Sequence, residues 1–268
     1  HILGVDVSDA RGDIDWAAAE ATGRIDFAML RAGFGRNNAD EKWVRNYTEV
    51  EKRGIPYGVY WFSYAYNLER AAKEADYCIK ALEGRSVELP VAWDFEYDSV
   101  AFAKKNGVIM TKALATQMAE VFLDKIRAAG FIPMLYTNAD YLLRYFDARL
   151  LDKYEVWLAQ WVSTPNLDKP PRSCGIWQYS NVGKIDGIPG NVDLDVLYTD
   201  YTGGNIMRYH TRDDIKSGAD WALATFDKLV ERGSLKGESK DDYNLSRDML
   251  RLLTIFDREG VFDKGVKK

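Results

Sequence analysis

Short apolar segments alternate with amphipathic segments along the first 138 residues, and this alternation constrains the fold more than any other feature of the chain. The amphipathic segments have the spacing of helices, and each ends at a glycine, a common helix stop. Strands that alternate with helices form parallel β/α units. The segments predicted as strands are 2–8, 27–33, 57–64, 89–96 and 132–138.

The pattern changes after residue 138. One weaker helical segment, 139–146, precedes three further predicted strands at 154–162, 174–180 and 191–198, which are joined by loops rich in Pro and Gly. About eight strands with helices in only the first five connections predict an α/β fold of the irregular TIM-like kind, with five β/α units plus three strands. An open doubly wound sheet is the structural alternative.

A domain boundary is predicted near 199–205, where the sequence reads TDYTGGN. Residues 1–203 would form the barrel, and residues 204–268 a small helical C-terminal module. In this module Thr211 and Asp214 have the spacing of a capping box. The predicted helices carry Trp221, Ala224 and Leu229 in the first, and, after a cap at Ser246, Met249, Leu250, Leu253 and Phe256 in the second.

So short a module can build only a thin core, so we expect it to lean on the barrel or on another copy. Three roles are open for it: binding of wall polymer, self-association, and covering of the barrel.

Composition excludes two classes of partner. The net charge of −5 argues against a protein that wraps nucleic acid. No apolar run approaches the roughly 20 residues that a bilayer requires, so no membrane partner is expected.

The chain contains only two His and two Cys, and this narrows the chemistry. His1 is the first residue and His210 lies beyond the predicted barrel. Because a serine triad and a Cys–His hydrolase each need a His, and hydrolytic zinc usually needs two or three His or Cys ligands, residues 2–200 cannot assemble such sites. We therefore expect carboxylate chemistry without metal or cofactor. Cys78 and Cys174 are expected as unpaired buried thiols.

Carboxylates concentrate at the predicted C-terminal ends of strands, where parallel barrels have their active sites. Asp6 ends the first strand, and Asp94 and Glu96 end the fourth. Residues i and i+2 of a strand share a face and lie about 6.6 Å apart along it. Asp94 and Glu96 therefore suit a general acid with a raised pKa and a partner acid, as glycoside hydrolysis requires. A strand end where two acids meet solvent or a basic residue is the alternative.

Four segments in the same order resemble the glycoside hydrolase family 25 lysozymes, the Chalaropsis-type N-acetylmuramidases. They are GVDVSDARGDIDW (4–16), VAWDFEY (91–97), VWLAQW (156–161) and WQYSNVGKIDGIPGNVDLDVLY (177–198). The resemblance implies an irregular barrel that cleaves the β-1,4 bond between N-acetylmuramic acid and N-acetylglucosamine in bacterial peptidoglycan. It also implies an endolysin of a phage or an autolysin of a bacterium, acting outside the cell or in the cell wall.

The resemblance assigns catalytic roles to four acids. Glu96 would protonate the leaving oxygen, and Asp94 would polarise the 2-acetamido group of the substrate, which attacks the anomeric carbon with net retention. Asp6 and Asp193 would tune this pair through hydrogen bonds, and Asp195 is a further candidate. The segment 31–35, RAGFG, departs from the Lys-Ala-Thr-Glu-Gly form of the family, which leaves Arg31 available for polar contacts.

Five residues at strand ends are candidates for sugar contacts, with core packing as the alternative for each. They are Phe62, Tyr64, Tyr136, Trp161 and Gln178. A non-catalytic carbohydrate-binding barrel is the alternative function, and a wall amidase or peptidase is excluded by the missing His and Cys ligands.

Overall fold

The computed structural model describes residues 1–202, 208–209, 211–237, 243 and 245–262. The chain divides into two compact units, His1–Tyr201 and Thr202–Lys268. Within the described ranges, no helix has the length and apolar character needed to span a membrane.

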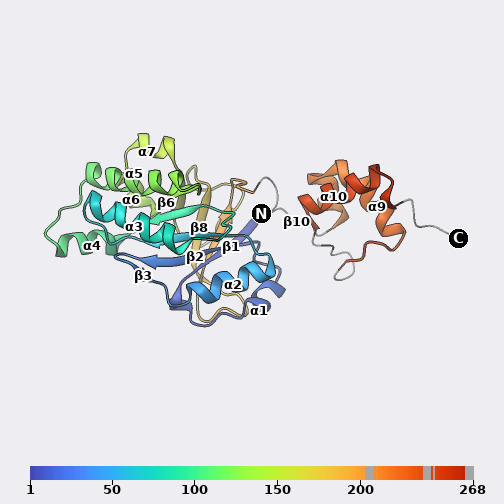
Figure 1. The fold of residues 1–268 in the computed structure, drawn as a ribbon, viewed down its shortest axis with the longest axis horizontal. Coiled ribbons are helices and arrows are strands. Elements are labelled where there is room, and N and C mark those ends of the chain that lie inside the picture. Colours follow the sequence, from blue (N-terminus) through green and yellow to red (C-terminus); the bar gives the residue numbers. More distant parts are fainter. Residues whose placement is uncertain (203–207, 210, 238–242, 244, 263–268) are drawn as a thin grey trace. The chain divides into compact units, whose positions relative to one another are not determined.

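Eight strands of the first unit form a closed barrel (Figure 1). Around the ring the order is β1, β9, β8, β7, β6, β5, β4 and β2, and pairing of β2 with β1 closes it. The predicted irregular barrel is confirmed, and the open doubly wound alternative is wrong. The strands are β1 (Ile2–Val7), β2 (Phe27–Phe34), β4 (Tyr57–Phe62), β5 (Val91–Asp94), β6 (Pro133–Asn138), β7 (Glu155–Ala159), β8 (Ile176–Gly183) and β9 (Val192–Leu197), with β3 (Asn38–Ala39) paired antiparallel to the last residues of β2.

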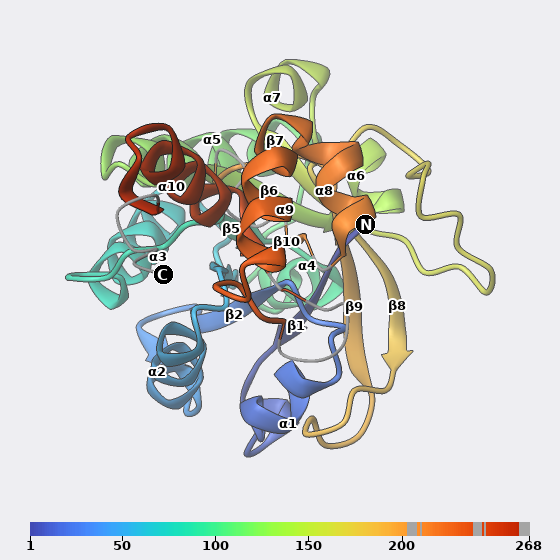
Figure 2. The ribbon, with the colours of Figure 1, turned by 90° about the vertical axis from the view of Figure 1, so that its right-hand side faces the viewer.

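The direction of the strands explains why the barrel is irregular. Neighbouring strands are parallel from β1 through β8, whereas β9 is antiparallel to both β8 and β1. Helices occur only in the first five connections, as predicted, and lie outside the strands (Figure 2). They are α1 (Trp16–Ala21), α2 (Trp43–Arg53), α3 (Leu68–Ala81), α4 (Tyr97–Lys105), α5 (Lys112–Ala128), α6 (Ala139–Tyr145) and α7 (Ala148–Lys153), with a 3-10 turn η1 (Asp9–Arg11) after β1.

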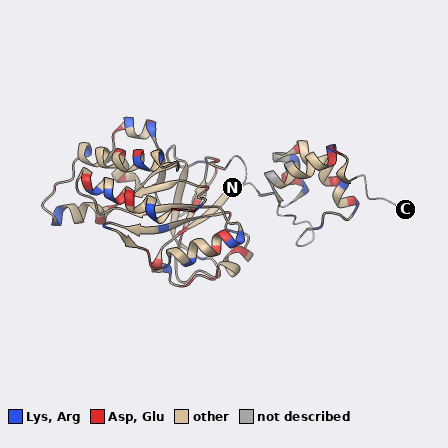
Figure 3. Ribbon diagram, viewed as in Figure 1, with Lys and Arg blue, Asp and Glu red and all other residues tan. Residues whose placement is uncertain are grey.

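The core of the barrel unit lies between strands and helices. Trp93 and Phe95 are fully buried, and the ring of Trp93 lies 6.2 Å from that of Phe122 on α5. Charged side chains are carried mainly by the helices, while the strands are mostly uncharged (Figure 3). Cys78 is buried in this core, whereas Cys174 is only half-buried, and both thiols are free.

The second unit has a small core of its own. Thr211 and Asp214 form the predicted capping box at the start of α8 (Arg212–Gly218). The single helix predicted to follow is wrong, because the backbone of Ala219 leaves the helical region (φ −150, ψ 48) and divides the segment into α8, η2 (Asp220–Ala222) and α9 (Leu223–Glu231).

The last helix, α10 (Arg247–Arg258), follows β11 (Leu245–Ser246), which pairs with β10 (Arg208–Tyr209). The predicted cap by the Ser246 side chain lies outside the described part. The side chains that form the core of this unit are Ile215, Ala219, Ala222, Phe226, Leu245 and Leu250.

Candidate active site

A cavity of about 250 Å³ lies at the barrel end where the parallel strands have their C-termini, and Asp193 reaches it from the start of the antiparallel β9. Its lining includes every predicted catalytic and sugar-contacting residue except Tyr64. The lining residues are Asp6, Arg31, Tyr60, Phe62, Asp94, Glu96, Tyr136, Trp157, Trp161, Gln178 and Asp193.

Asp94 and Glu96 face this cavity together because extended backbone continues past the end of β5. Glu96 is the N-cap residue of α4, with φ −132 and ψ −172. The intervening Phe95 is held to β6, since its N–H donates to the carbonyl of Tyr136 (3.1 Å) and its carbonyl accepts from Thr137 Oγ1 (2.8 Å). The alternation predicted for this segment thus extends into the loop, and the apolar side chains point to the helices.

The two carboxyl groups share an environment that favours their protonated forms. Asp94 is 2% exposed, and within the described part of the chain its Oδ1 has no donor. Burial, and then the charge of Glu96, raises the pKa of Asp94 well above its ordinary value. Burial also raises the pKa of Glu96. Hydrogen bonding between the two side chains raises the pKa of Asp94 and lowers that of Glu96, so a proton between them is held more firmly by Asp94.

A second group of acids lies on β1 and β9. Asp6 is directly opposite Asp193 in the antiparallel register. Burial raises the pKa of Asp6, and the charges of Asp195 and Asp193 add to this. Asp195 does not line the cavity; it is fully buried and accepts from Trp157 Nε1 at 2.8 Å. Burial raises the pKa of Asp193, while the charge of Arg11 lowers it.

Gln178 connects the second acid group to the rim of the cavity. Its Nε2 donates to Asp6 Oδ2 at 2.7 Å, and its Oε1 accepts from Tyr136 OH at 3.1 Å and from Trp161 Nε1 at 2.9 Å. The Tyr136 hydroxyl is also hydrogen-bonded to Glu96. Through these hydrogen bonds, Gln178 and Tyr136 connect Asp6 with Glu96. The Trp161 side chain is 55% exposed and is therefore accessible to a ligand.

Tyr64 differs from the other predicted residues. It lines a neighbouring pocket, although its ring centroid lies 5.1 Å from that of Phe62, which does line the cavity.

Arg31 gives the cavity a fixed positive charge. Its Nε donates to Asp40 Oδ2 at 2.8 Å and its Nη2 to Asp9 Oδ1, so the side chain is held from two sides. Its charge lowers the pKa of Asp94 against the effect of burial. The position that departs from the family motif thus contributes directly to the electrostatics of the site.

Two lining residues, Tyr60 and Trp157, were not predicted. Tyr60 precedes Phe62 by two residues on β4, and Trp157 precedes Trp161 by four residues, so strand alternation places each on the face of a predicted residue. Extending the alternation backwards along the strands would have found both.

Comparisons with known proteins agree over the barrel unit. A model of the glycosyl hydrolases family 25 matches residues 5–188. Lysozyme M1 of Streptomyces globisporus is 29% identical over 203 residues, which cover 72% of this chain and 66% of that protein. A family 25 glycosyl hydrolase from Bacillus anthracis superposes with a TM-score of 0.61 at 26% identity, covering 74% of this chain and 89% of that one.

The modular autolysin LytC of Streptococcus pneumoniae has the same fold, with a TM-score of 0.63 at 24% identity over 74% of this chain and 46% of that one. The chain therefore spans about two thirds of the length of Lysozyme M1 and less than half of LytC. Because the family model matches more than half of the sequence, and the matched residues include the Asp94–Glu96 pair and the barrel that carries it, the chain belongs to the glycosyl hydrolases family 25.

Proposed function

We propose that the chain is a lysozyme that hydrolyses the β-1,4 bond between N-acetylmuramic acid and N-acetylglucosamine in bacterial peptidoglycan. The observation that carries the proposal is that the buried Asp94 and the half-buried Glu96 line one cavity at the C-terminal end of strand β5 in a family 25 barrel. Two carboxyl groups with different roles are what hydrolysis of a glycoside requires.

Glu96 is the general acid in this proposal. Burial raises its pKa above the ordinary value, which favours the protonated form that a general acid needs, and it lies at the N-terminus of α4, where the cavity opens past the strand. It donates its proton to the glycosidic oxygen and later removes one from the attacking water.

Asp94 acts on the 2-acetamido group of the substrate. In the free protein the pair shares one proton, and the N–H of a bound acetamide needs an acceptor. Donation of that N–H to Asp94 stabilises its ionised form, so the shared proton moves to Glu96, where the reaction uses it. The acetamide oxygen then attacks the anomeric carbon, and water opens the cyclic intermediate with net retention.

Asp6, Asp193 and Gln178 keep the pair in place and tune its charge. Gln178 is hydrogen-bonded to both Asp6 and Tyr136, and Tyr136 is hydrogen-bonded to Glu96, so the positions of these side chains depend on one another. Phe62 and the exposed ring of Trp161 offer faces for sugar rings.

The site of action follows from the substrate. A protein that cleaves peptidoglycan acts outside the cell or in the cell wall, after secretion or after release as an endolysin. We assign residues 1–203 to catalysis and residues 204–268 to wall binding or self-association. On α10 the side chains of Met249, Leu252, Ile255 and Phe256 are 44–54% exposed, which suits either role.

Mass spectrometry of digested peptidoglycan tests the proposal. We expect new reducing ends on N-acetylmuramic acid, with the same yield in the presence of a chelator. Reducing ends on N-acetylglucosamine would contradict the assigned bond. Binding to walls without cleavage would favour the non-catalytic carbohydrate-binding barrel.

A further inference from the structure

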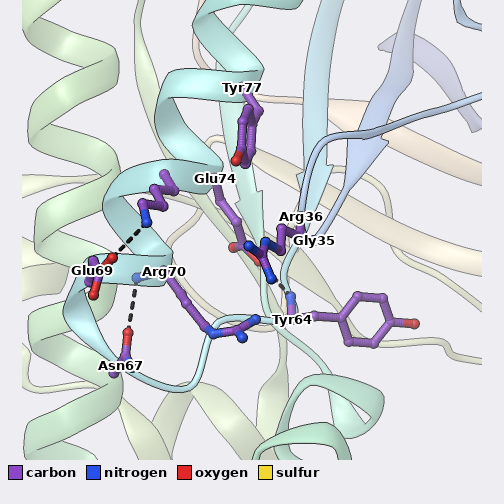
Figure 4. A pocket seen from close by; sticks show the side chains of 9 residues that line it. Gly35, Arg36, Tyr64, Asn67, Glu69, Arg70, Glu74 and Tyr77 are labelled. Carbon is purple, nitrogen blue, oxygen red and sulfur yellow. Dashed lines mark hydrogen bonds and ion pairs between the residues drawn. The ribbon is translucent and has the colours of Figure 1, made fainter.

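A second cavity, of about 190 Å³, lies at the same end of the barrel as the catalytic one (Figure 4). Gly35 follows β2, Tyr64 follows β4, and the remaining lining residues belong to the start of α3 or its cap. The cavity is lined by Gly35, Arg36, Tyr64, Asn67, Glu69, Arg70, Lys73, Glu74 and Tyr77.

Two arginines of this cavity form no ion pair among the described residues, although their charges lower the pKa of the nearby Glu69. Lys73 is paired with Glu69 at 2.6 Å, but neither Arg36 nor Arg70 forms an ion pair with any carboxylate of the described residues. The guanidinium of Arg70 lies over the ring of Tyr66, 4.2 Å from its centroid, which fixes its plane. Figure 4 shows both arginines reaching toward the space beside Tyr64.

Among the described residues no ion pair joins Glu74 to either arginine, although the charge of Arg70 lowers the pKa of Glu74. Its carboxylate is 3% exposed and accepts from Ser63 Oγ at 2.7 Å, the Tyr64 N–H at 2.8 Å and Trp93 Nε1 at 3.3 Å. These three donors, all of them from the barrel unit, already occupy the carboxylate oxygens of Glu74. The local excess of positive charge therefore faces the cavity, in a chain whose net charge is −5.

The loop that carries Arg36 is anchored rather than free. The Gly35 N–H donates to the carbonyl of Phe62 at 2.8 Å, and the Gly35 carbonyl accepts from Trp61 Nε1 at 3.2 Å. Gly35 has φ +49, and a Cβ at this position would lie 3.0 Å from the Tyr64 ring. This close approach holds Arg36 next to Tyr64.

The two cavities are neighbours through their aromatic walls. The ring of Tyr64 lines the second cavity and packs on Phe62, which lines the catalytic one. The Phe62 and Tyr64 rings therefore lie between the lining of the catalytic cavity and that of the cavity to which Arg36 and Arg70 belong.

We propose that Arg36 and Arg70 form a subsite for an oxyanion of the wall polymer, namely a carboxylate of the stem peptide on the sugar next to the cleaved bond. This inference rests on the proposed function. Guanidinium groups bind carboxylates through paired charge-assisted hydrogen bonds, and peptides of peptidoglycan carry free carboxylates. A phosphate of an attached anionic polymer has similar chemistry and is separated from the peptide by the test below.

The test compares purified glycan chains that bear stem peptides with the same chains after enzymatic removal of the peptides. The variant is the double substitution Arg36→Gln/Arg70→Gln, and the control is Arg149→Gln, an exposed arginine on α7. We expect kcat/KM of the double variant to fall about tenfold on the peptide-bearing chains, the scale of one charge-assisted hydrogen bond. Cleavage of peptide-free chains and the rate of the control should stay unchanged, with equal melting temperatures.

Equal loss on both kinds of chain, or no loss on either, would overturn the subsite while leaving the lysozyme function intact. Loss confined to walls that carry a phosphate polymer, relative to walls stripped of it, would assign the arginines to phosphate and overturn the peptide assignment. Wild-type protein that cleaves neither chain contradicts the proposed function itself, and the subsite with it. Arg36→Lys/Arg70→Lys should recover part of the rate, since the charge returns without the paired geometry.

Discussion

At the scale of single residues, we assign the chemistry to two carboxyl groups, the buried Asp94 and the half-buried Glu96. Neither Asp94 nor Glu96 can ionise without cost, because burial disfavours each charge and the first charge disfavours the second. Arg31 offsets part of this cost at Asp94. In the proposed mechanism the substrate offers a hydrogen-bond donor to Asp94 and takes the proton from Glu96.

Replacing Glu96 by Gln should remove most of the activity. The amide keeps the size of the side chain but has no proton to give, and proton transfer by a placed acid contributes about 10²–10⁴-fold. The measurement is kcat on purified peptidoglycan, with Asp152→Asn as control, since Asp152 is an exposed acid on α7 that does not line the cavity. A Glu96→Gln protein as active as the control would show that another group donates the proton.

The stereochemistry of the product tests the role of Asp94. If the acetamide attacks, proton NMR of the first-formed product shows the β-anomer. Asp94→Asn should also lose activity, because an amide stabilises the developing positive charge less than a carboxylate does. A first-formed α-anomer would mean inversion, and a covalent adduct on Asp94 would assign the attack to the carboxylate.

Position along a strand predicts which side chains face the site, but not what they contact there. Asp94, Glu96 and Asp6 were located because strand alternation and barrel topology fix their face. The hydrogen bond from Gln178 to Asp6 joins residues 172 positions apart and depends on register across the closed barrel. The burial of Asp195 beneath Trp157 depends on the same register.

At the scale of elements, long segments with strong periodicity were predicted and short ones were not. The start of α4 could not be predicted, because the alternating strand pattern continues through its N-cap residue Glu96, and Glu is not a preferred N-cap residue. The two residues of β3 and the six of α7 are too short for a periodic signal. In the second unit, α8 ends at Gly218, a residue type that commonly stops helices, and the predicted single helix ran past this signal.

Glu74 ties one helix to two strands, and its titration should be visible in stability. It joins α3 to Ser63 and Tyr64 after β4 and to Trp93 on β5, and burial raises its pKa from 4.5 to about 7. Between these values the folded state binds more protons than the unfolded state, so the free energy of unfolding falls as pH rises, by roughly 3 kcal/mol at most from this group. Above pH 7 its contribution is constant.

Denaturant unfolding of Glu74→Gln at pH 5 and pH 8 measures this share. Between pH 5 and pH 8, the free energy of unfolding should fall less in the variant than in the wild type. Glu69→Gln, an exposed acid on the same helix, should keep the wild-type difference. An unchanged difference in Glu74→Gln would mean that other acids produce the whole effect.

At the scale of the molecule, the barrel is completed before the second unit begins. The first strand pairs with the last, since Ile2 is opposite Leu197 and Asp6 is opposite Asp193. In the segment that follows β9, Tyr201 OH and Thr199 Oγ1 donate to Glu155 Oε2 at 2.8 Å and 3.1 Å. The last turns of the first unit thus belong to its own fold, and the second unit has a separate small core.

Residues 1–203 should therefore fold alone and cleave soluble peptidoglycan chains at the rate of the full chain. The physical reason is that all eight barrel strands and every residue that lines the catalytic cavity precede residue 203. The measurements are the melting temperature and kcat/KM of the shortened protein on soluble chains, beside clearing of whole cells. If residues 204–268 bind the wall, only the clearing of cells should slow. If instead they complete the barrel core, the shortened protein will be insoluble or melt many degrees lower, and the assignment of catalysis to residues 1–203 alone is then wrong.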